Sequence, residues 1–156
     1  MVFIHDTRDK ATKHRNVDEY LESQGHKIIR SKLFVGDVSL LNDQSTSIDL
    51  KRNLQEVASN VGQDHARFKR ELERAQEYGI KLVFLVEHGG GIRTLDDVPN
   101  WNNPRLKDHP LALSGERLHK IMLTMANRYG IEWQFCDKRC TGKRIIEILS
   151  RGDRDG

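Results

Sequence analysis

The sequence lacks the long apolar run that a membrane-spanning helix needs. None of its hydrophobic stretches approaches the ~20 residues required to cross a bilayer. Its first ten residues, MVFIHDTRDK, do not place a basic segment before an apolar one, as a signal peptide would. Of the 156 residues, 37% are hydrophobic and 31% are charged, which is typical of globular domains. We therefore expect one soluble domain, residues 1–156, located in the cytoplasm with no membrane partner.

Cysteine is also scarce, with only Cys136 and Cys140 in the chain. Two cysteines are too few for a disulfide scaffold, so a reducing cytosol is the simpler expectation. Their C-x₃-C spacing would suit half of a zinc site, but no second cysteine pair accompanies it. A zinc role is therefore the weaker interpretation.

Several motifs of common enzymes are missing. The chain has no P-loop and no G-x-G-x-x-G, so we expect no nucleotide cofactor. The segment 88–91 reads HGGG, as in the oxyanion loop of lipase-like hydrolases, but the G-x-S-x-G nucleophile motif is absent. We interpret 88–91 as a flexible loop. A hydrolase acting on a substrate other than nucleic acid stays a third alternative, without an identifiable nucleophile.

The most informative stretch runs from residue 35 to residue 56, VGDVSLLNDQSTSIDLKRNLQE. Asp37 follows a glycine and an apolar run, where we expect a strand to end. After eleven intervening residues, Asp49, Leu50 and Lys51 form an Asp-x-Lys on an apolar segment. On neighbouring strands this gap brings both carboxylates to one end of the sheet. Strand alternation places Asp49 and Lys51 on one face and Leu50 on the other.

Two carboxylates and one ammonium group suit a divalent cation held beside a phosphate. Carboxylate oxygens are suitable ligands for Mg²⁺, which can lower the pKa of a bound water and neutralise a scissile phosphodiester. A lysine can stabilise the developing oxyanion. The alternative is a solvated pair, because Asp-x-Lys is common on exposed strand faces. The apolar neighbours of both aspartates favour a functional site.

The hydrophobic pattern predicts an α/β fold, a mixed sheet with helices on both faces. We expect a hairpin or one bent ribbon over 26–41, a strand at 81–87 buried on both faces, and a segment 94–103 that covers the active face. Asn16, Asn53, Asp64 and Ser114 are the expected helix caps. Strands are predicted at 2–5, 26–30, 32–41, 47–52, 81–87 and 131–136, helices at 16–24, 53–61, 64–78, 114–129 and 141–149, and a flexible tail at 150–156.

Positive charge is modest overall, at +3 with a pI near 8.9, which permits a polyanionic partner without requiring one. Its distribution is more informative, because Arg67, Arg70 and Arg74 form a stripe on one predicted helix, beside the apolar face. We expect this stripe to bind DNA phosphates. The alternative is a solvated face paired with Glu71, Glu73 and Glu77.

Several of these pieces together resemble a known family. The pieces are Asp6-Thr7-Arg8-Asp9, VGD ending at Asp37, SIDLK ending at Lys51, a basic helix and LVFLVE. In this order and spacing, over about residues 3–88, the chain resembles the XPF-type nuclease domain of XPF and Hef. That domain is a branch of the restriction-endonuclease-like PD-(D/E)XK superfamily.

The resemblance implies a restriction-endonuclease-like fold and a Mg²⁺- or Mn²⁺-dependent DNA endonuclease acting on flaps, forks or Holliday junctions. It also implies a homodimer and a stand-alone bacterial or phage protein that processes repair, recombination or replication intermediates. By position, Asp37, Asp49 and the backbone carbonyl of Leu50 would be metal ligands and Lys51 the catalytic lysine. Asp6 and Arg8 would support the site, with Arg8 near a phosphate.

Four positions depart from the family pattern. Asp49 replaces a glutamate, Leu50 an arginine, Gln55 an aspartate and Asp9 a glutamate. The 156 residues also leave no room for the helix-hairpin-helix domain common in XPF relatives. These departures motivate a second hypothesis, in which the chain is a catalytically inactive DNA-binding accessory module.

Overall fold

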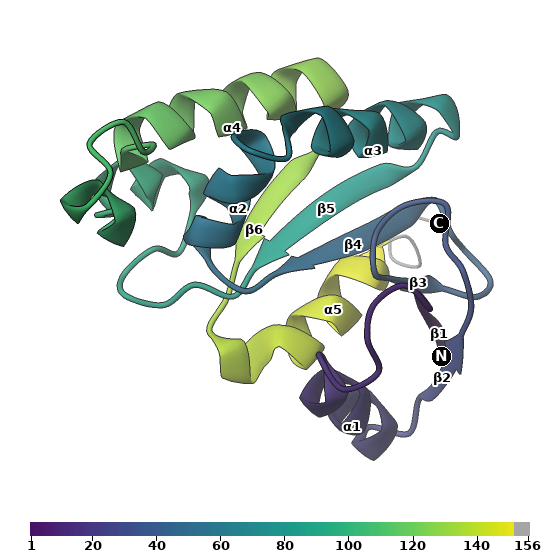
Figure 1. Cartoon of the computed structure of the whole chain (residues 1–156). Coiled ribbons are helices and arrows are strands. Elements are labelled where there is room, and N and C mark those ends of the chain that lie inside the picture. The colour runs from purple at the N-terminus through teal and green to yellow at the C-terminus, as the bar shows by residue number, and fades with distance from the viewer. Residues whose placement is uncertain (152–156) are drawn as a thin grey trace.

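The chain folds around a six-stranded mixed sheet with the order β2-β1-β3-β4-β5-β6 (Figure 1). The computed structural model describes residues 1–151, so most of the tail expected at 150–156 lies outside the described residues. The pairs β1–β2, β4–β5 and β5–β6 are parallel, whereas β3 runs antiparallel to both β1 and β4. The strands are β1 (Val2–His5), β2 (Lys27–Arg30), β3 (Val38–Leu40), β4 (Thr46–Lys51), β5 (Lys81–Val86) and β6 (Glu132–Phe135).

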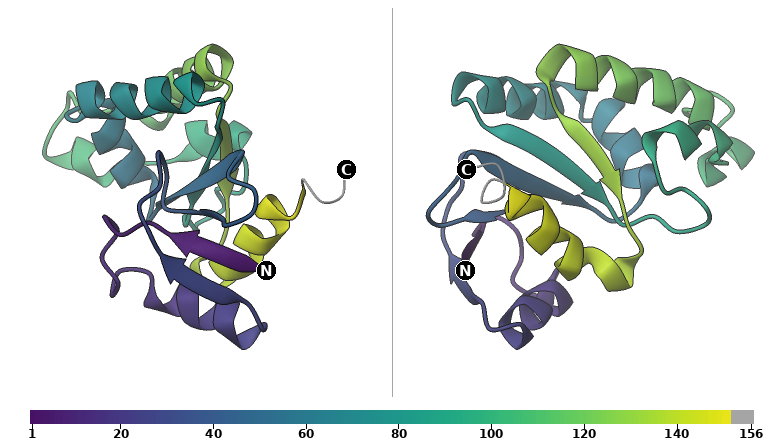
Figure 2. Two further views of the ribbon diagram at one scale, coloured as in Figure 1. Left: turned by 90° about the vertical axis from the view of Figure 1, so that its right-hand side faces the viewer. Right: turned by 180° about the vertical axis from the view of Figure 1, so that it is seen from behind.

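Helices cover both faces of the sheet, as the sequence predicts (Figures 1 and 2). On one face lie α1 (Arg15–Ser23) and α5 (Thr141–Leu149), and on the other lie α2 (Leu54–Val61), α3 (His65–Glu77) and α4 (Gly115–Tyr129). Three short 3₁₀ helices complete the fold: η1 (Leu95–Asn100), η2 (Pro104–Lys107) and η3 (Lys138–Cys140). No helix in the described part of the chain is long and apolar enough to cross a membrane.

The interior strand β5, between β4 and β6, confirms the prediction of burial on both faces. Leu82, Phe84 and Val86 join the core beneath α2, α3 and α4. Val83 and Leu85 join the core beneath α1 and α5. Because alternate side chains point to opposite faces, one apolar strand supplies two hydrophobic layers.

Helix starts follow the expected caps in two of four cases. The expectation for Asp64 is wrong, because its side chain makes no cap hydrogen bond at the start of α3. The Asn53 side chain accepts a hydrogen bond from the Glu56 N–H (2.9 Å), and Ser114 accepts one from the Arg117 N–H (3.2 Å). The expectation for Asn16 is wrong, because α1 begins one residue earlier, at Arg15, with no side-chain cap. The residue before it, His14, is buried beside Asp9, so tertiary packing determines where α1 begins.

The hairpin or ribbon expected over 26–41 is wrong. The β2 and β3 strands do not pair, because β1 lies between them. The intervening residues are irregular, and β3 begins only at Val38. Hydrogen bonds to side chains replace strand pairing in this segment. The Leu33 N–H donates to Asp6 (2.7 Å), and the Arg8 side chain donates to the Leu33 carbonyl (2.6 Å). Asp37 therefore precedes a strand instead of ending one.

Gly36 allows this loop to approach β4 closely. Its φ is +79°, a conformation that L side chains rarely adopt, and a Cβ would collide with the Ser47 hydroxyl. That hydroxyl donates a hydrogen bond to the Val35 carbonyl (2.7 Å). The close approach brings Asp37 into the β4 ladder, where its N–H donates to the Ile48 carbonyl (2.7 Å).

A Gly36→Ala substitution should lower the free energy of unfolding by more than about 2 kcal/mol, because it combines an unfavourable φ with a steric collision. Gly79→Ala is the matched control, since Gly79 also has a positive φ but open space around it. We expect a loss of about 1 kcal/mol for the control. Urea unfolding measures both, and equal losses would contradict the close approach.

Candidate active site

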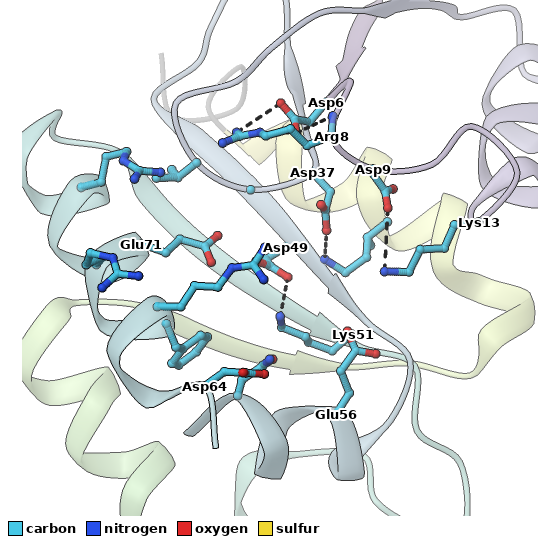
Figure 3. Close-up of a pocket in the computed structure, with 18 residues that line it drawn as sticks. Asp6, Arg8, Asp9, Lys13, Asp37, Asp49, Lys51, Glu56, Asp64 and Glu71 are labelled. Atoms are coloured by element: carbon cyan, nitrogen blue, oxygen red, sulfur yellow. Dashed lines mark hydrogen bonds and ion pairs between the residues drawn. The ribbon is translucent and has the colours of Figure 1, made fainter. Parts of the chain in front are cut away.

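One cavity collects most of the residues that the sequence singles out (Figure 3). It has a volume of about 620 Å³ and lies on the side of the sheet covered by α2 and α3. Its walls come from the loop after β1, the loop before β3, the end of β4, and both helices. The lining residues are Asp6, Arg8, Asp9, Lys13, Val35, Gly36, Asp37, Asp49, Leu50, Lys51, Glu56, Asn60, Asp64, Arg67, Phe68, Arg70, Glu71 and Arg74.

Asp37 and Asp49 meet at this cavity from neighbouring parts of the sheet. The Leu50 N–H donates to Asp37 Oδ2 (2.7 Å), which couples the two segments directly. The Leu50 side chain packs in the core of the opposite face, so only its main chain borders the cavity. Asp49 and Lys51 share the cavity face, and the predicted alternation is confirmed.

Lys51 is held by charge and by aromatic rings. Its Nζ lies 3.1 Å from Asp49 Oδ1 and 5.7 Å from the ring centroids of Phe68 and Phe84. Burial alone would lower the pKa of Lys51, but the Asp49 and Glu71 carboxylates raise it above its ordinary value. The side chain therefore remains an ammonium group in this structure and acts as a positive charge and hydrogen-bond donor.

Glu71 is a cavity residue that sequence reasoning missed, because it was considered only as a partner of the arginine stripe. It lies on α3 and faces Asp49 (Figure 3). Burial and the charge of Asp49 raise the pKa of Glu71, and the same two causes raise the pKa of Asp37. Helical spacing was an available signal, since Glu71 stands three residues after Phe68 and four before Ala75, both buried.

These carboxylates fit a divalent cation. Burial and the charge of Asp49 raise the pKa values of Asp37 and Glu71, and a bound cation would lower both by stabilising the carboxylate forms. Within residues 1–151, no three His, Cys, Asp or Glu side chains are grouped so as to hold a metal by themselves. Mg²⁺ does not need such a cage, because it commonly takes one or two carboxylates with waters and substrate phosphates.

Asp6 and Arg8 brace the wall of the cavity. Asp6 accepts hydrogen bonds from the Arg8 side chain (2.8 Å) and from the Leu33 N–H (2.7 Å). Burial would raise the pKa of Asp6, but these hydrogen bonds outweigh it and lower the pKa. Because its oxygens are already engaged, Asp6 supports the loops, while the half-exposed Arg8 guanidinium reaches the cavity.

The arginine stripe faces the same cavity. Arg67, Arg70 and Arg74 all line it and are all exposed. Within the described residues none of them forms an ion pair, and the one ion pair within α3 joins Lys69 to Glu73 (3.8 Å). The three guanidinium groups are therefore not neutralised as the solvated-face alternative would require.

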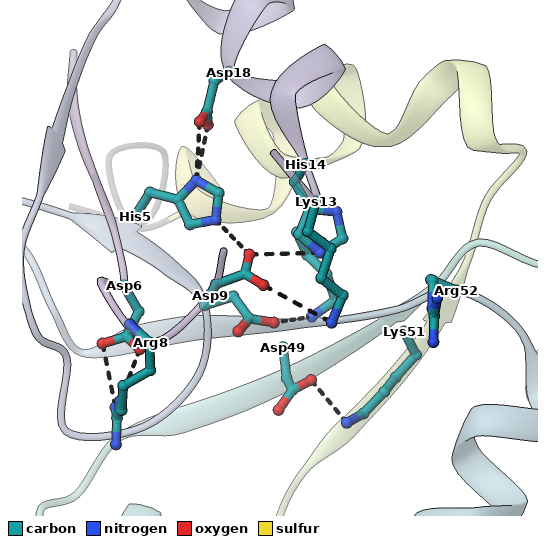
Figure 4. A network of polar contacts seen from close by, with 12 residues as sticks. His5, Asp6, Arg8, Asp9, Lys13, His14, Asp18, Asp49, Lys51 and Arg52 are labelled. Carbon is teal, nitrogen blue, oxygen red and sulfur yellow. Dashed lines mark hydrogen bonds and ion pairs between the residues drawn. The ribbon is translucent and has the colours of Figure 1, made fainter. Parts of the chain in front are cut away.

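A buried polar network supports the cavity from behind (Figure 4). The His5 ring donates to Asp18 through Nδ1 (2.9 Å) and to Asp9 through Nε2 (2.6 Å). Lys13 Nζ and His14 Nε2 also approach Asp9, at 3.8 and 3.5 Å. Burial lowers the pKa of His5, but hydrogen bonds and charge from both carboxylates outweigh it and raise the pKa to about 9. His5 therefore holds Asp9 at the cavity wall as an imidazolium.

Two other segments that the sequence singles out, 88–91 and 94–103, do not line this cavity. The segment 94–103, expected to cover the active face, does not line it, because η1 packs against α4 instead. Within this segment Trp101 is buried as packing. His88 Nδ1 accepts a hydrogen bond from the Leu54 N–H (3.1 Å), which ties the 88–91 loop to α2.

The cysteine pair shows no metal-site geometry in the described chain. Both thiols are free, and Cys140 is exposed. Cys136 lies near the Thr141 hydroxyl (3.7 Å), and burial raises its pKa to about 11.

Comparison with solved structures confirms the fold. The chain is similar to XPF from Aeropyrum pernix, with a TM-score of 0.69 and 20% identity over 99% of this chain and 66% of that one. It is also similar to XPF from Aeropyrum pernix in complex with DNA, with a TM-score of 0.67 and 21% identity over 99% of this chain and 65% of that one. The chain thus spans slightly under two thirds of those proteins. No family model and no curated protein matches the sequence.

The class defined by this fold is the restriction-endonuclease-like α/β domain with a mixed sheet between two helical layers. Within that class, the architecture is that of the XPF nuclease domain. The resemblance inferred from residues 3–88 is therefore confirmed as a fold over 99% of the chain.

The His5 network should make stability depend on pH. The pKa of His5 is raised on folding, from about 6.5 to about 9, so its stabilisation is fully present below pH ~6.5 and is lost as the pH rises through 9. The free energy of unfolding of the wild type, relative to that of His5→Gln, should fall by about 3 kcal/mol from pH 6 to pH 9.5. Chemical denaturation at the two pH values measures it, and a constant difference would rule out a charged His5.

Proposed function

We propose that the chain is a metal-dependent DNA endonuclease. The observation that supports this proposal is one cavity lined by Asp37, Asp49, Lys51 and Glu71 together with three arginines that form no ion pair within the described residues. An acidic centre beside basic side chains suits a substrate that is a polyanion but reacts at a cation.

Asp37, Asp49 and the backbone carbonyl of Leu50 would hold Mg²⁺ or Mn²⁺. When bound, such an ion lowers the pKa of a water and neutralises charge on the scissile phosphate. Lys51, kept as an ammonium group by Asp49 and Glu71, donates to the oxygen on which negative charge develops. Asp6 holds Arg8 at the cavity edge, where its guanidinium contacts a flanking phosphate.

We infer branched DNA as the substrate, cut in repair, recombination or replication intermediates by a homodimer. Similarity to XPF from Aeropyrum pernix, which also has a structure in complex with DNA, supports a nucleic-acid substrate by analogy. We also propose that this nuclease domain acts in the cytosol of a bacterium or of a phage-infected host.

The alternative is an inactive DNA-binding module of the same fold. Its motivation is the altered motif, in which Gln55 replaces an aspartate. Gln55 does not line the cavity, whereas its neighbour Glu56 does. A carboxylate is therefore still present on α2 at the cavity, and this favours the active enzyme.

Asp37→Asn and Lys51→Met should each reduce Mg²⁺-dependent cleavage of flap, fork and four-way DNA by at least about 100-fold. Each removes transition-state stabilisation worth several kcal/mol. Asp96→Asn is the matched control, since Asp96 is exposed on η1 and does not line the cavity. Gel assays with Mg²⁺ and Mn²⁺ measure cleavage. Tight binding by the wild type without any cutting would instead support the inactive module.

Replacing Arg67, Arg70 and Arg74 by alanine should weaken DNA binding and flatten its salt dependence. Each lost phosphate contact removes about 0.9 from the slope of log K against log salt concentration. The control is a triple alanine variant of Arg93, Arg105 and Arg117, which are exposed and lie outside the cavity. Both variants lose the same charge, so equal slopes in a fluorescence-anisotropy titration would show that α3 is not the DNA face.

A further inference from the structure

Two large aromatic side chains lie exposed beside the cavity. The rings of Phe34 and Tyr78 are stacked, with centroids 4.4 Å apart and an interplanar angle of 23°. Both residues remain more than half exposed, at 53% and 52%. Neither belongs to the two hydrophobic cores, so core packing does not require them at this position.

Their position connects them to the cavity. Phe34 directly precedes Val35 and Gly36, which line the cavity, and Tyr78 is the C-cap of α3, one turn after Arg74. The Arg74 side chain donates a hydrogen bond to the Phe34 carbonyl (3.4 Å), so the guanidinium and the aromatic pair share one edge. A nucleotide whose phosphate contacts Arg74 would therefore have its base beside the rings.

We propose that Phe34 and Tyr78 form a stacking platform for the base of an unpaired nucleotide next to the cleaved phosphate. This inference rests on the proposed nuclease function and specifies its substrate. The two rings cover one face of each other, and both side chains remain more than half exposed, which leaves aromatic surface accessible to a base. Aromatic faces stack on any base without regard to sequence.

The platform selects for single-stranded character. A base inside a duplex has both faces covered by its neighbours, so it cannot stack on a protein ring without being extruded, which costs free energy. A nucleotide in a flap or in the single-stranded arm of a fork already exposes a face. The preferred substrate is therefore DNA with unpaired nucleotides beside the cut, rather than a fully paired junction.

The test compares binding of two DNA molecules in EDTA, where metal-dependent cleavage cannot interfere. One is a flap with 2-aminopurine in its single-stranded arm beside the branch, and the other is a fully paired duplex of the same length. The Phe34→Leu/Tyr78→Leu double variant keeps apolar bulk but removes both ring faces. We expect it to bind the flap about tenfold more weakly, to lose the stacking-dependent quenching of 2-aminopurine, and to bind the duplex like the wild type.

Matched controls separate stacking from simple loss of structure or of apolar surface. Leu41→Ala/Leu111→Ala changes two exposed apolar residues outside the cavity and should leave flap binding and quenching unchanged. Phe34→Tyr/Tyr78→Phe keeps both ring faces and should retain flap affinity and quenching. Urea unfolding should give the same stability for the leucine double variant as for the wild type.

The outcomes distinguish the platform from the proposed function. Preserved flap affinity and quenching in the leucine double variant would overturn the platform, and so would equal losses on flap and duplex. Either result leaves the nuclease proposal intact, since the wild type would still bind and cut DNA. If the wild type binds neither DNA, the proposed function and the platform are both overturned.

Discussion

The site depends on one constraint, which is that several carboxyl groups crowd together at the end of β4. Asp37, Asp49 and Glu71 bring three carboxylates to one buried corner, where burial and mutual repulsion raise the pKa of two of them. The Leu50 N–H and the Lys51 ammonium group offset part of this cost through hydrogen bonding and charge. A divalent cation would lower both pKa values by stabilising the carboxylate forms, and this supports the proposed metal site.

The surroundings of this corner are rigid where the carboxylates must be held. Gly36 lets the loop pass close to Ser47, and the ladder bond from Asp37 to Ile48 extends the sheet into the loop. On the other side of the cavity, His5 fixes Asp9 from behind. The Asp37 main chain is thus hydrogen-bonded to β4, and the Asp9 side chain is hydrogen-bonded to His5. This matters because an aspartate has little reach with which to correct a misplaced backbone.

From the acidic corner outward, carboxylates give way to arginines and then to exposed aromatic rings. Carboxylates and Lys51 lie at the centre, and the unpaired guanidinium groups of α3 lie along its edge. The stacked pair of Phe34 and Tyr78 lies beyond Arg74. A nucleic-acid strand has the same order of features, because its reactive phosphorus lies between flanking phosphates and the bases project outward. This order of carboxylates, arginines and aromatic rings therefore supports the proposed nucleic-acid substrate over a small phosphorylated metabolite.

Local patterns in the sequence determined most strands, most helices, the face shared by Asp49 and Lys51, and the caps at Asn53 and Ser114, because these depend on residues close in the chain. Only the tertiary structure decided what depends on distant partners. The β1 strand separates β2 from β3 because Asp6 and Arg8 bind the chain near Leu33, and His14 sets the start of α1 through Asp9. Glu71 becomes part of the site only because α3 packs across β4, a contact between segments that no local pattern specifies.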